Sequence, residues 1–99
     1  MAVMQIEILP LGTGTPSVSS YVAQAMKVVQ ESGLPHQLTP MATVVEGEVD
    51  ELLNLARRIH EVPFEAGAQR VVTIITIDDR RDKPLSLQGK VRSVEEKLS

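Results

Sequence analysis

The segment from Arg70 to Ile77 constrains the fold of this chain more than any other. It reads Arg-Val-Val-Thr-Ile-Ile-Thr-Ile, which as a strand places apolar residues on both faces and one threonine on each. Both faces of such a strand need cover. In a chain of 99 residues, helices can cover only one face of a sheet, so we expect the other face to pack against a second copy of the protein.

The N-terminal third predicts a strand followed by a helix. Residues 3–11 have the period of a half-buried strand, with Met4, Ile6 and Ile8 on one side and Gln5 and Glu7 on the other. The second side is not fully polar, since Val3, Leu9 and Leu11 share it. Apolar side chains then recur at helical spacing at Val18, Val22, Ala25, Met26 and Val29. We expect Thr15 or Ser17 to cap this helix at its start, and Gly33 to end it.

The middle of the chain predicts two short strands and a second helix. His36 to Glu46 is apolar and β-branched, but Pro40 has no N–H for a sheet, so we divide the segment at Thr39-Pro40. The second helix carries an apolar stripe formed by Val49, Leu52, Leu53, Ala56 and Ile59. We expect Pro63 to kink or end this helix.

The resulting order of elements predicts an α+β fold. Strand, helix, strand, strand, helix and strand follow one another, which is the βαββαβ arrangement of a ferredoxin-like sandwich with an antiparallel sheet. The right-handed crossover rule places both helices on one face of the sheet and leaves the other face open for an oligomer. A further amphipathic helix follows, with Leu87, Val91, Val94 and Leu98 at spacings of four, three and four. We expect residues 1–99 to form a single domain.

Composition excludes several classes of function. The net charge of -3, with interspersed signs and two aromatic residues of the Phe, Trp and Tyr types, disfavours nucleic acid as a partner. The absence of cysteine excludes disulfides and thiolate metal sites, and it is compatible with the cytoplasm. No apolar run approaches the length of a membrane span, so no membrane partner is expected.

Residues 12–20, which read Gly-Thr-Gly-Thr-Pro-Ser-Val-Ser-Ser, form the first candidate site. They join the first strand to the first helix, where unpaired N–H groups and hydroxyls can hold a small polar or anionic group. Ser17 stands where a dinucleotide fingerprint has its third glycine, and no lysine of a phosphate-binding loop follows, so a nucleotide is not supported. The structural alternative is a tight turn that only caps a helix.

The break between the two short strands is the second candidate site. Thr39 and Thr43 offer hydroxyls and Met41 a thioether, while Pro40 frees a neighbouring carbonyl from the ladder, so the segment can read the edge of a heteroaromatic ring. The alternative is a hairpin turn whose threonines face solvent.

Catalytic and metal-binding signatures are weak. Residues 78–83 read Asp-Asp-Arg-Arg-Asp-Lys, which we interpret as a solvated loop with salt bridges rather than a metal site. His36 and His60 show no metal-ligand pairing, and no local signature indicates a catalytic triad. We therefore expect no enzyme activity, no cofactor and no metal.

A set of ordered motifs resembles one known family from end to end. The motifs are Leu9-Pro10-Leu11-Gly12-Thr13-Gly14, Ser17-Val18-Ser19, Tyr21-Val22, Leu38-Thr39-Pro40-Met41, Glu46-Gly47-Glu48, Arg70-Val71-Val72-Thr73, Ile77-Asp78-Asp79-Arg80-Arg81-Asp82-Lys83 and Gly89-Lys90-Val91. The sequence resembles the small thiamine-binding protein family, once catalogued as a domain of unknown function. One departure is Ala42, which stands where a glycine is usual.

The resemblance implies a ferredoxin-like fold, a homodimer or homotetramer, and thiamine or its hydroxymethylpyrimidine half as the ligand. Carried over to this sequence, it implies a pocket lined by Ser17, Ser19, Thr39, Pro40, Met41 and Thr43. Leu9, Pro10 or Met41 would cover the ring faces. Glu7, Glu46 and Glu48 are the carboxylates that could favour the cationic thiazolium. The implied role is a non-catalytic carrier, scavenger or sensor, and the alternative is an oligomeric protein-interaction module without a small ligand.

Overall fold

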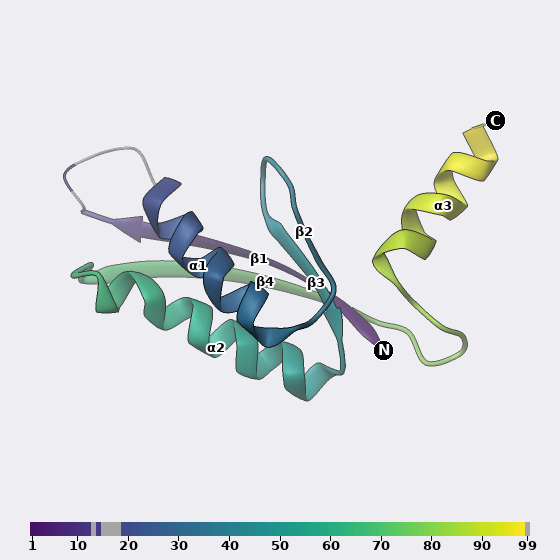
Figure 1. Ribbon diagram of the computed structural model, residues 1–99, viewed down its shortest axis with the longest axis horizontal. Helices are drawn as coiled ribbons and strands as arrows, with labels where there is room; N and C mark the ends of the chain where they lie inside the picture. The colour runs from purple at the N-terminus through teal and green to yellow at the C-terminus, as the bar shows by residue number, and fades with distance from the viewer. Residues whose placement is uncertain (13, 15–18, 99) are drawn as a thin grey trace.

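The computed structural model describes residues 1–12, 14 and 19–98 and has the predicted order of elements (Figure 1). They are β1 (Ala2–Leu11), α1 (Ser19–Ser32), β2 (His36–Leu38), β3 (Thr43–Gly47), α2 (Val49–Glu65), β4 (Arg70–Asp79) and α3 (Leu87–Leu98). The sheet is antiparallel in the order β2-β3-β1-β4. Helices α1 and α2 lie on one face of it, so the ferredoxin-like prediction is confirmed (Figure 1).

The core lies between β1 and the two helices. Met4, Ile6 and Ile8 are buried on the helix side of β1, as the alternation predicts. They pack in one cluster with Val29 of α1 and Leu52 of α2. Because the chain has few aromatic residues, burial of these aliphatic side chains supplies most of the apolar stabilisation of the fold.

The second helix differs from the prediction in two places. The expected stripe included Leu53, which is 47% exposed, whereas Leu55 is buried in its place. The helix also does not end at Pro63 but continues to Glu65. A proline this close to the C-terminus costs one helical hydrogen bond, and burial of its ring offsets part of that cost.

Strand β4 lies at an edge of the sheet and is apolar on both faces. Register with β1 places Ile75 opposite the buried Ile6 on the helix side, and Ile74 opposite Glu7 on the open side. Both isoleucines are more than two-fifths exposed. Together with Leu9, Leu11 and Val72, Ile74 leaves an uncovered apolar strip on the open face. Cover of this face by a second copy stays a prediction.

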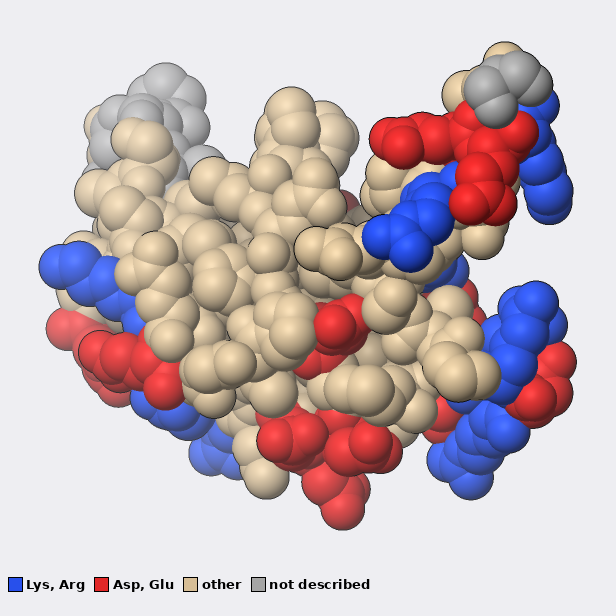
Figure 2. Space-filling model, turned by 45° about the vertical axis from the view of Figure 1, so that its right-hand side comes forward, with Lys and Arg blue, Asp and Glu red and all other residues tan. Residues whose placement is uncertain are grey.

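Helix α3 extends away from the sheet (Figure 1). None of its described residues is buried, and its predicted apolar stripe, including Val91, Val94 and Leu98, is exposed. No helix among residues 1–12, 14 and 19–98 is long and apolar enough to span a membrane. On the face shown in Figure 2, acidic and basic side chains are interspersed around a mostly uncharged centre.

Candidate functional site

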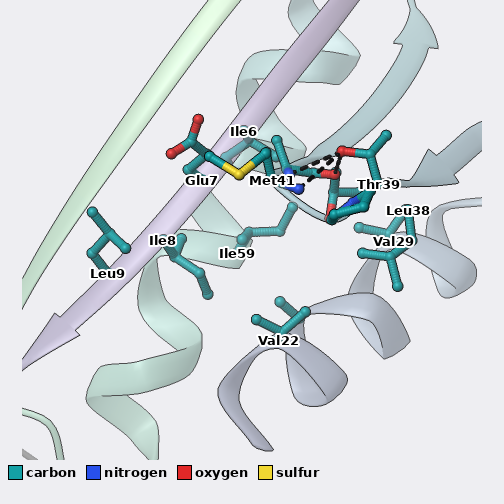
Figure 3. Close-up of a pocket in the computed structure, with 14 residues that line it drawn as sticks. Ile6, Glu7, Ile8, Leu9, Val22, Val29, Leu38, Thr39, Met41 and Ile59 are labelled. Carbon is teal, nitrogen blue, oxygen red and sulfur yellow. Dashed lines mark hydrogen bonds between the residues drawn. The ribbon is translucent and has the colours of Figure 1, made fainter. Parts of the chain in front are cut away.

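A cavity of about 300 Å³ opens between β1, α1 and the turn that joins β2 to β3 (Figure 3). Its lining is mostly aliphatic and comprises Ile6, Glu7, Ile8, Leu9, Val22, Ala25, Val29, Leu38, Thr39, Pro40, Met41, Ala42, Thr43 and Ile59. A cavity of this size with few polar groups is typical of sites for small, largely apolar ligands.

The cavity exists because β1 extends beyond the end of its pairing with β3. Strand β1 pairs with β4 from Ala2 to Leu11, but with β3 only from Ala2 to Ile6. Among the described residues, no strand pairs with the other side of β1 beyond Ile6. Backbone N–H and C=O groups of a strand alternate along such a side, so this edge offers donors and acceptors to a ligand.

The turn from β2 to β3 is fixed by Thr39. Its hydroxyl donates to the carbonyl of Ala42 at 2.8 Å and accepts from the N–H groups of Ala42 at 3.0 Å and Met41 at 3.3 Å. The N–H of Thr39 also donates to the Ala42 carbonyl at 2.9 Å. The Thr39 hydroxyl is therefore used to build the wall of the cavity, which differs from the expectation that it reads a ligand.

Two polar side chains remain for a ligand. The hydroxyl of Thr43 contacts only a weak acceptor, the sulfur of Met26 at 3.6 Å, so it can turn to a better partner. Glu7 is half-buried, and its carboxylate lies 3.5 Å from the side-chain nitrogen of Gln5. Figure 3 shows the side chains of Met41 and Glu7 next to each other. The side chain of Met41 is 80% exposed, so it is placed to fold over a bound ring.

Six of the eight residues predicted for the site line this one cavity, namely Glu7, Leu9, Thr39, Pro40, Met41 and Thr43. Ser19 is the first residue of α1 and does not line it, whereas Ser17 lies outside the described residues. The two other candidate carboxylates have separate roles. Glu46 accepts a hydrogen bond from Leu87, and Glu48 is the N-cap residue of α2.

Sequence reasoning missed the floor of the cavity. Val22, Ala25 and Val29 of α1, with Ile59 of α2, form part of it, although their helical spacing identified them only as core residues. Periodicity shows which helix face is inward, but it cannot show where that face is left partly uncovered by the sheet.

The charged segment at residues 78–83 forms ion pairs, as interpreted. Arg80 pairs with Asp82 at 2.6 Å and Arg81 with Asp79 at 2.8 Å. The hydrogen bond from Arg81 lowers the pKa of Asp79 below the usual carboxyl value, and that from Arg80 does the same for the pKa of Asp82. Among the described residues, no three His, Cys, Asp or Glu side chains are grouped to hold a metal ion.

Comparison with known proteins adds independent information. A sequence model of the family described as thiamine-binding protein matches residues 4–95. The UPF0045 protein YqgV of Bacillus subtilis is 47% identical, over 99% of this chain and 98% of its own. A UPF0045 protein of Methanothermobacter thermautotrophicus is 39% identical, over 99% of this chain and all of its own.

Solved structures share the fold. A hypothetical protein of Methanocaldococcus jannaschii superposes with a TM-score of 0.87 and 35% identity, over 96% of each chain. A candidate thiamine biosynthesis or salvage protein of Thermotoga maritima superposes with a TM-score of 0.78, over 94% of this chain and 97% of its own. Its identity of 20% supports a common fold only.

Proposed function

The chain belongs to the thiamine-binding protein family, and from that premise we propose that the cavity between β1, α1 and the β2–β3 turn binds thiamine or its hydroxymethylpyrimidine half. The observation that carries the proposal is the side of β1 beyond Ile6, which no strand of the described residues pairs and which borders a mostly aliphatic cavity. The protein then acts as a carrier, scavenger or sensor of the compound.

Backbone groups at this edge match the chemistry of an aminopyrimidine. The ring presents an amino donor beside a ring-nitrogen acceptor, and a free strand edge presents acceptors and donors in one plane. The Thr43 hydroxyl adds a partner from the opposite wall. Glu7 supplies a negative charge near the place where the cationic thiazolium would follow the pyrimidine.

The ring faces are covered without aromatic stacking. Ile8 and Val22 line the helix side of the cavity, and Met41 lies next to Glu7 (Figure 3). Aliphatic and thioether groups in contact with a ring contribute through apolar burial and dispersion. This arrangement binds a flat ring but places few restraints on its substituents.

Binding without catalysis is part of the proposal. Glu7 is the one ionisable side chain among the described residues that line the cavity. General acid-base or nucleophilic catalysis needs a group whose pKa and orientation are set by a second partner. The neutral contact of Glu7 with Gln5 does not supply such a pair.

Calorimetric titration of the purified protein with thiamine and with hydroxymethylpyrimidine tests the proposal. We expect both to bind, because both carry the aminopyrimidine. An analogue with oxygen in place of the amino group should bind at least about tenfold more weakly, since a buried acceptor of the site loses the amino donor that it is paired with. No heat from thiamine or hydroxymethylpyrimidine at high micromolar concentration would refute the ligand.

A second candidate is an oligomeric interaction module without a small ligand. It is favoured by the uncovered apolar strip of Leu9, Leu11, Val72 and Ile74 on the open face of the sheet. Self-association through this face is compatible with either function. Recovery of a stable complex with another protein, together with the absence of heat in the titrations, would favour the module.

A further inference from the structure

A second cavity, of about 550 Å³, lies at the end of β1. It is lined by Leu11 of β1, Tyr21 in the first turn of α1, and Gly67, Gln69 and Arg70 between α2 and β4. The proposed binding of the pyrimidine does not use it. Its lining differs from that of the first cavity because it includes a guanidinium, a phenol and a primary amide.

Arg70 differs from three cations near the end of β4. Arg80, Arg81 and Lys90 are each paired with an aspartate at 2.6 to 2.8 Å, so their charge is already compensated. No carboxylate of the described residues forms an ion pair with Arg70, and no acidic residue lines its cavity. The cavity is therefore a place of uncompensated positive charge in a chain whose net charge is -3.

The two cavities adjoin along the same two elements. Leu9 lines the first and Leu11 the second, which places them about 7 Å apart along β1. On α1, Val22 lines the first and Tyr21, the residue before it, lines the second. A ligand that occupies the first cavity and extends along β1 therefore points toward Arg70.

Charges along this path follow a definite order. Glu7 lies at the first cavity, and Arg70 pairs in register with Leu11, four residues further along β1. Glu7, Leu9, Leu11 and Arg70 share the open face of the sheet, because alternate residues of a strand point to the same side, so in an assembly formed through this face the path lies along the interface. A ligand that complements this order carries a cationic group near its ring and an anionic group beyond it.

We propose that the second cavity is an anion subsite that receives the phosphate of a phosphorylated form of the ligand, with Arg70 as its principal contact. The guanidinium pairs with two phosphate oxygens through parallel N–H groups, and the phenol of Tyr21 donates to a third. This inference rests on the proposed binding of thiamine in the first cavity. The preferred ligand is then a thiamine phosphate, in which the thiazolium is the cation and the phosphate the anion.

Titrations with thiamine and with thiamine monophosphate separate this inference from the proposed function. The wild-type protein should bind the monophosphate about tenfold more tightly than thiamine. Arg70→Gln should abolish that difference and leave the affinity for thiamine unchanged. Arg92→Gln on the exposed helix α3 removes a cation outside the cavity, and it should change neither affinity.

Two results of these titrations would overturn the subsite. One is that the wild-type protein binds thiamine and thiamine monophosphate with equal affinity, and the other is that Arg70→Gln weakens the binding of both compounds equally. If thiamine does not bind, the proposed function fails, and titration with inorganic pyrophosphate tests the subsite alone by NMR. Shifts of the Gly67 and Arg70 amides that Arg70→Gln removes would support it. If these shifts are absent, or if Arg70→Gln changes only the oligomeric mass of the protein, Arg70 is not the contact for an anion.

Discussion

The carboxylate of Glu46 on β3 accepts a 2.8 Å hydrogen bond from the backbone N–H of Leu87, the first residue of α3. An acidic group at a helix start satisfies an unpaired N–H and interacts favourably with the helix dipole. Lys90, one turn later, pairs with Asp78 at the end of β4 at 2.6 Å. The first turn of α3 is thus fixed to two strands of the sheet, while the rest of the helix extends into solvent.

Replacement of Glu46 by alanine should release the first turn of α3. We expect the amides of residues 87–91 to exchange faster with solvent and the free energy of unfolding to fall by about 1 kcal/mol, the usual value of a helix cap. Hydrogen exchange and urea unfolding measure the two effects. Glu95→Ala, further along the same helix, should leave these amides unchanged. Equal exchange in both variants would show that Glu46 does not hold the helix.

Much of the fold follows from the pattern of the sequence. Alternation at Met4, Ile6 and Ile8 and the break at Pro40 correctly predicted β1 and the β2–β3 pair, because both depend on local rules. The pattern did not predict that Leu55, rather than Leu53, is buried in the core. Both lie near the boundary of the apolar stripe of α2, and only the position of the sheet decides which is covered.

The residue pattern alone indicated one wall of the candidate site, whereas Glu7 and Leu9 of β1 were expected only from the family resemblance. The hairpin residues from Thr39 to Thr43 are adjacent in sequence, so their chemistry was visible as a motif. The free edge of β1 depends on how far β3 extends along it, which is a matter of long-range register. Use of the Thr39 hydroxyl within its own turn depends on the local backbone path, which the residue types alone do not determine.

Thr39→Val should weaken the turn beside the cavity. Valine keeps the branched shape but removes a hydroxyl that makes one donated and two accepted hydrogen bonds. We expect the free energy of unfolding to fall by about 1 to 2 kcal/mol, as measured by urea denaturation. Thr43→Val is the matched control, because its hydroxyl contacts only a sulfur at 3.6 Å. A loss of the same size in both variants would contradict the role given to Thr39.

The reverse contrast is expected for ligand binding. Thr43→Val should weaken binding of thiamine about five- to tenfold, since the lost hydroxyl is the one that can turn to the ligand. Calorimetry on folded protein measures the change. Thr76→Val, on the open face of β4 opposite Gln5, should have no effect on affinity. If Thr43→Val binds thiamine as tightly as the wild type, the pyrimidine contacts must come from elsewhere.

The ion pair of Asp79 with Arg81 predicts a pH-dependent stability. The hydrogen bond from Arg81 lowers the pKa of Asp79 in the folded state, so the pair favours folding above the ordinary carboxyl pKa of about 3.9. This contribution is lost as the pH falls through the lowered value. Asp79→Asn should therefore melt slightly below the wild type at about pH 6, and the difference should shrink as the pH falls below the ordinary carboxyl pKa. Because the pair is exposed, added salt should reduce the difference at pH 6, and a difference that does not shrink on acidification would contradict this origin.

Ile74→Asp tests self-association through the open face of the sheet. Ile74 is 46% exposed and lies opposite Glu7, so the wild-type protein should bury it against a second copy. We expect light scattering to give a multiple of the single-chain mass for the wild type and the single-chain mass for the variant. The aspartate would otherwise be buried without a partner beside the carboxylate of Glu7.

Gln24→Asp, exposed on α1, controls for the added charge and should stay associated. Circular dichroism should show the helix and sheet content of both variants unchanged, and a single-chain mass for the wild type would refute the assembly.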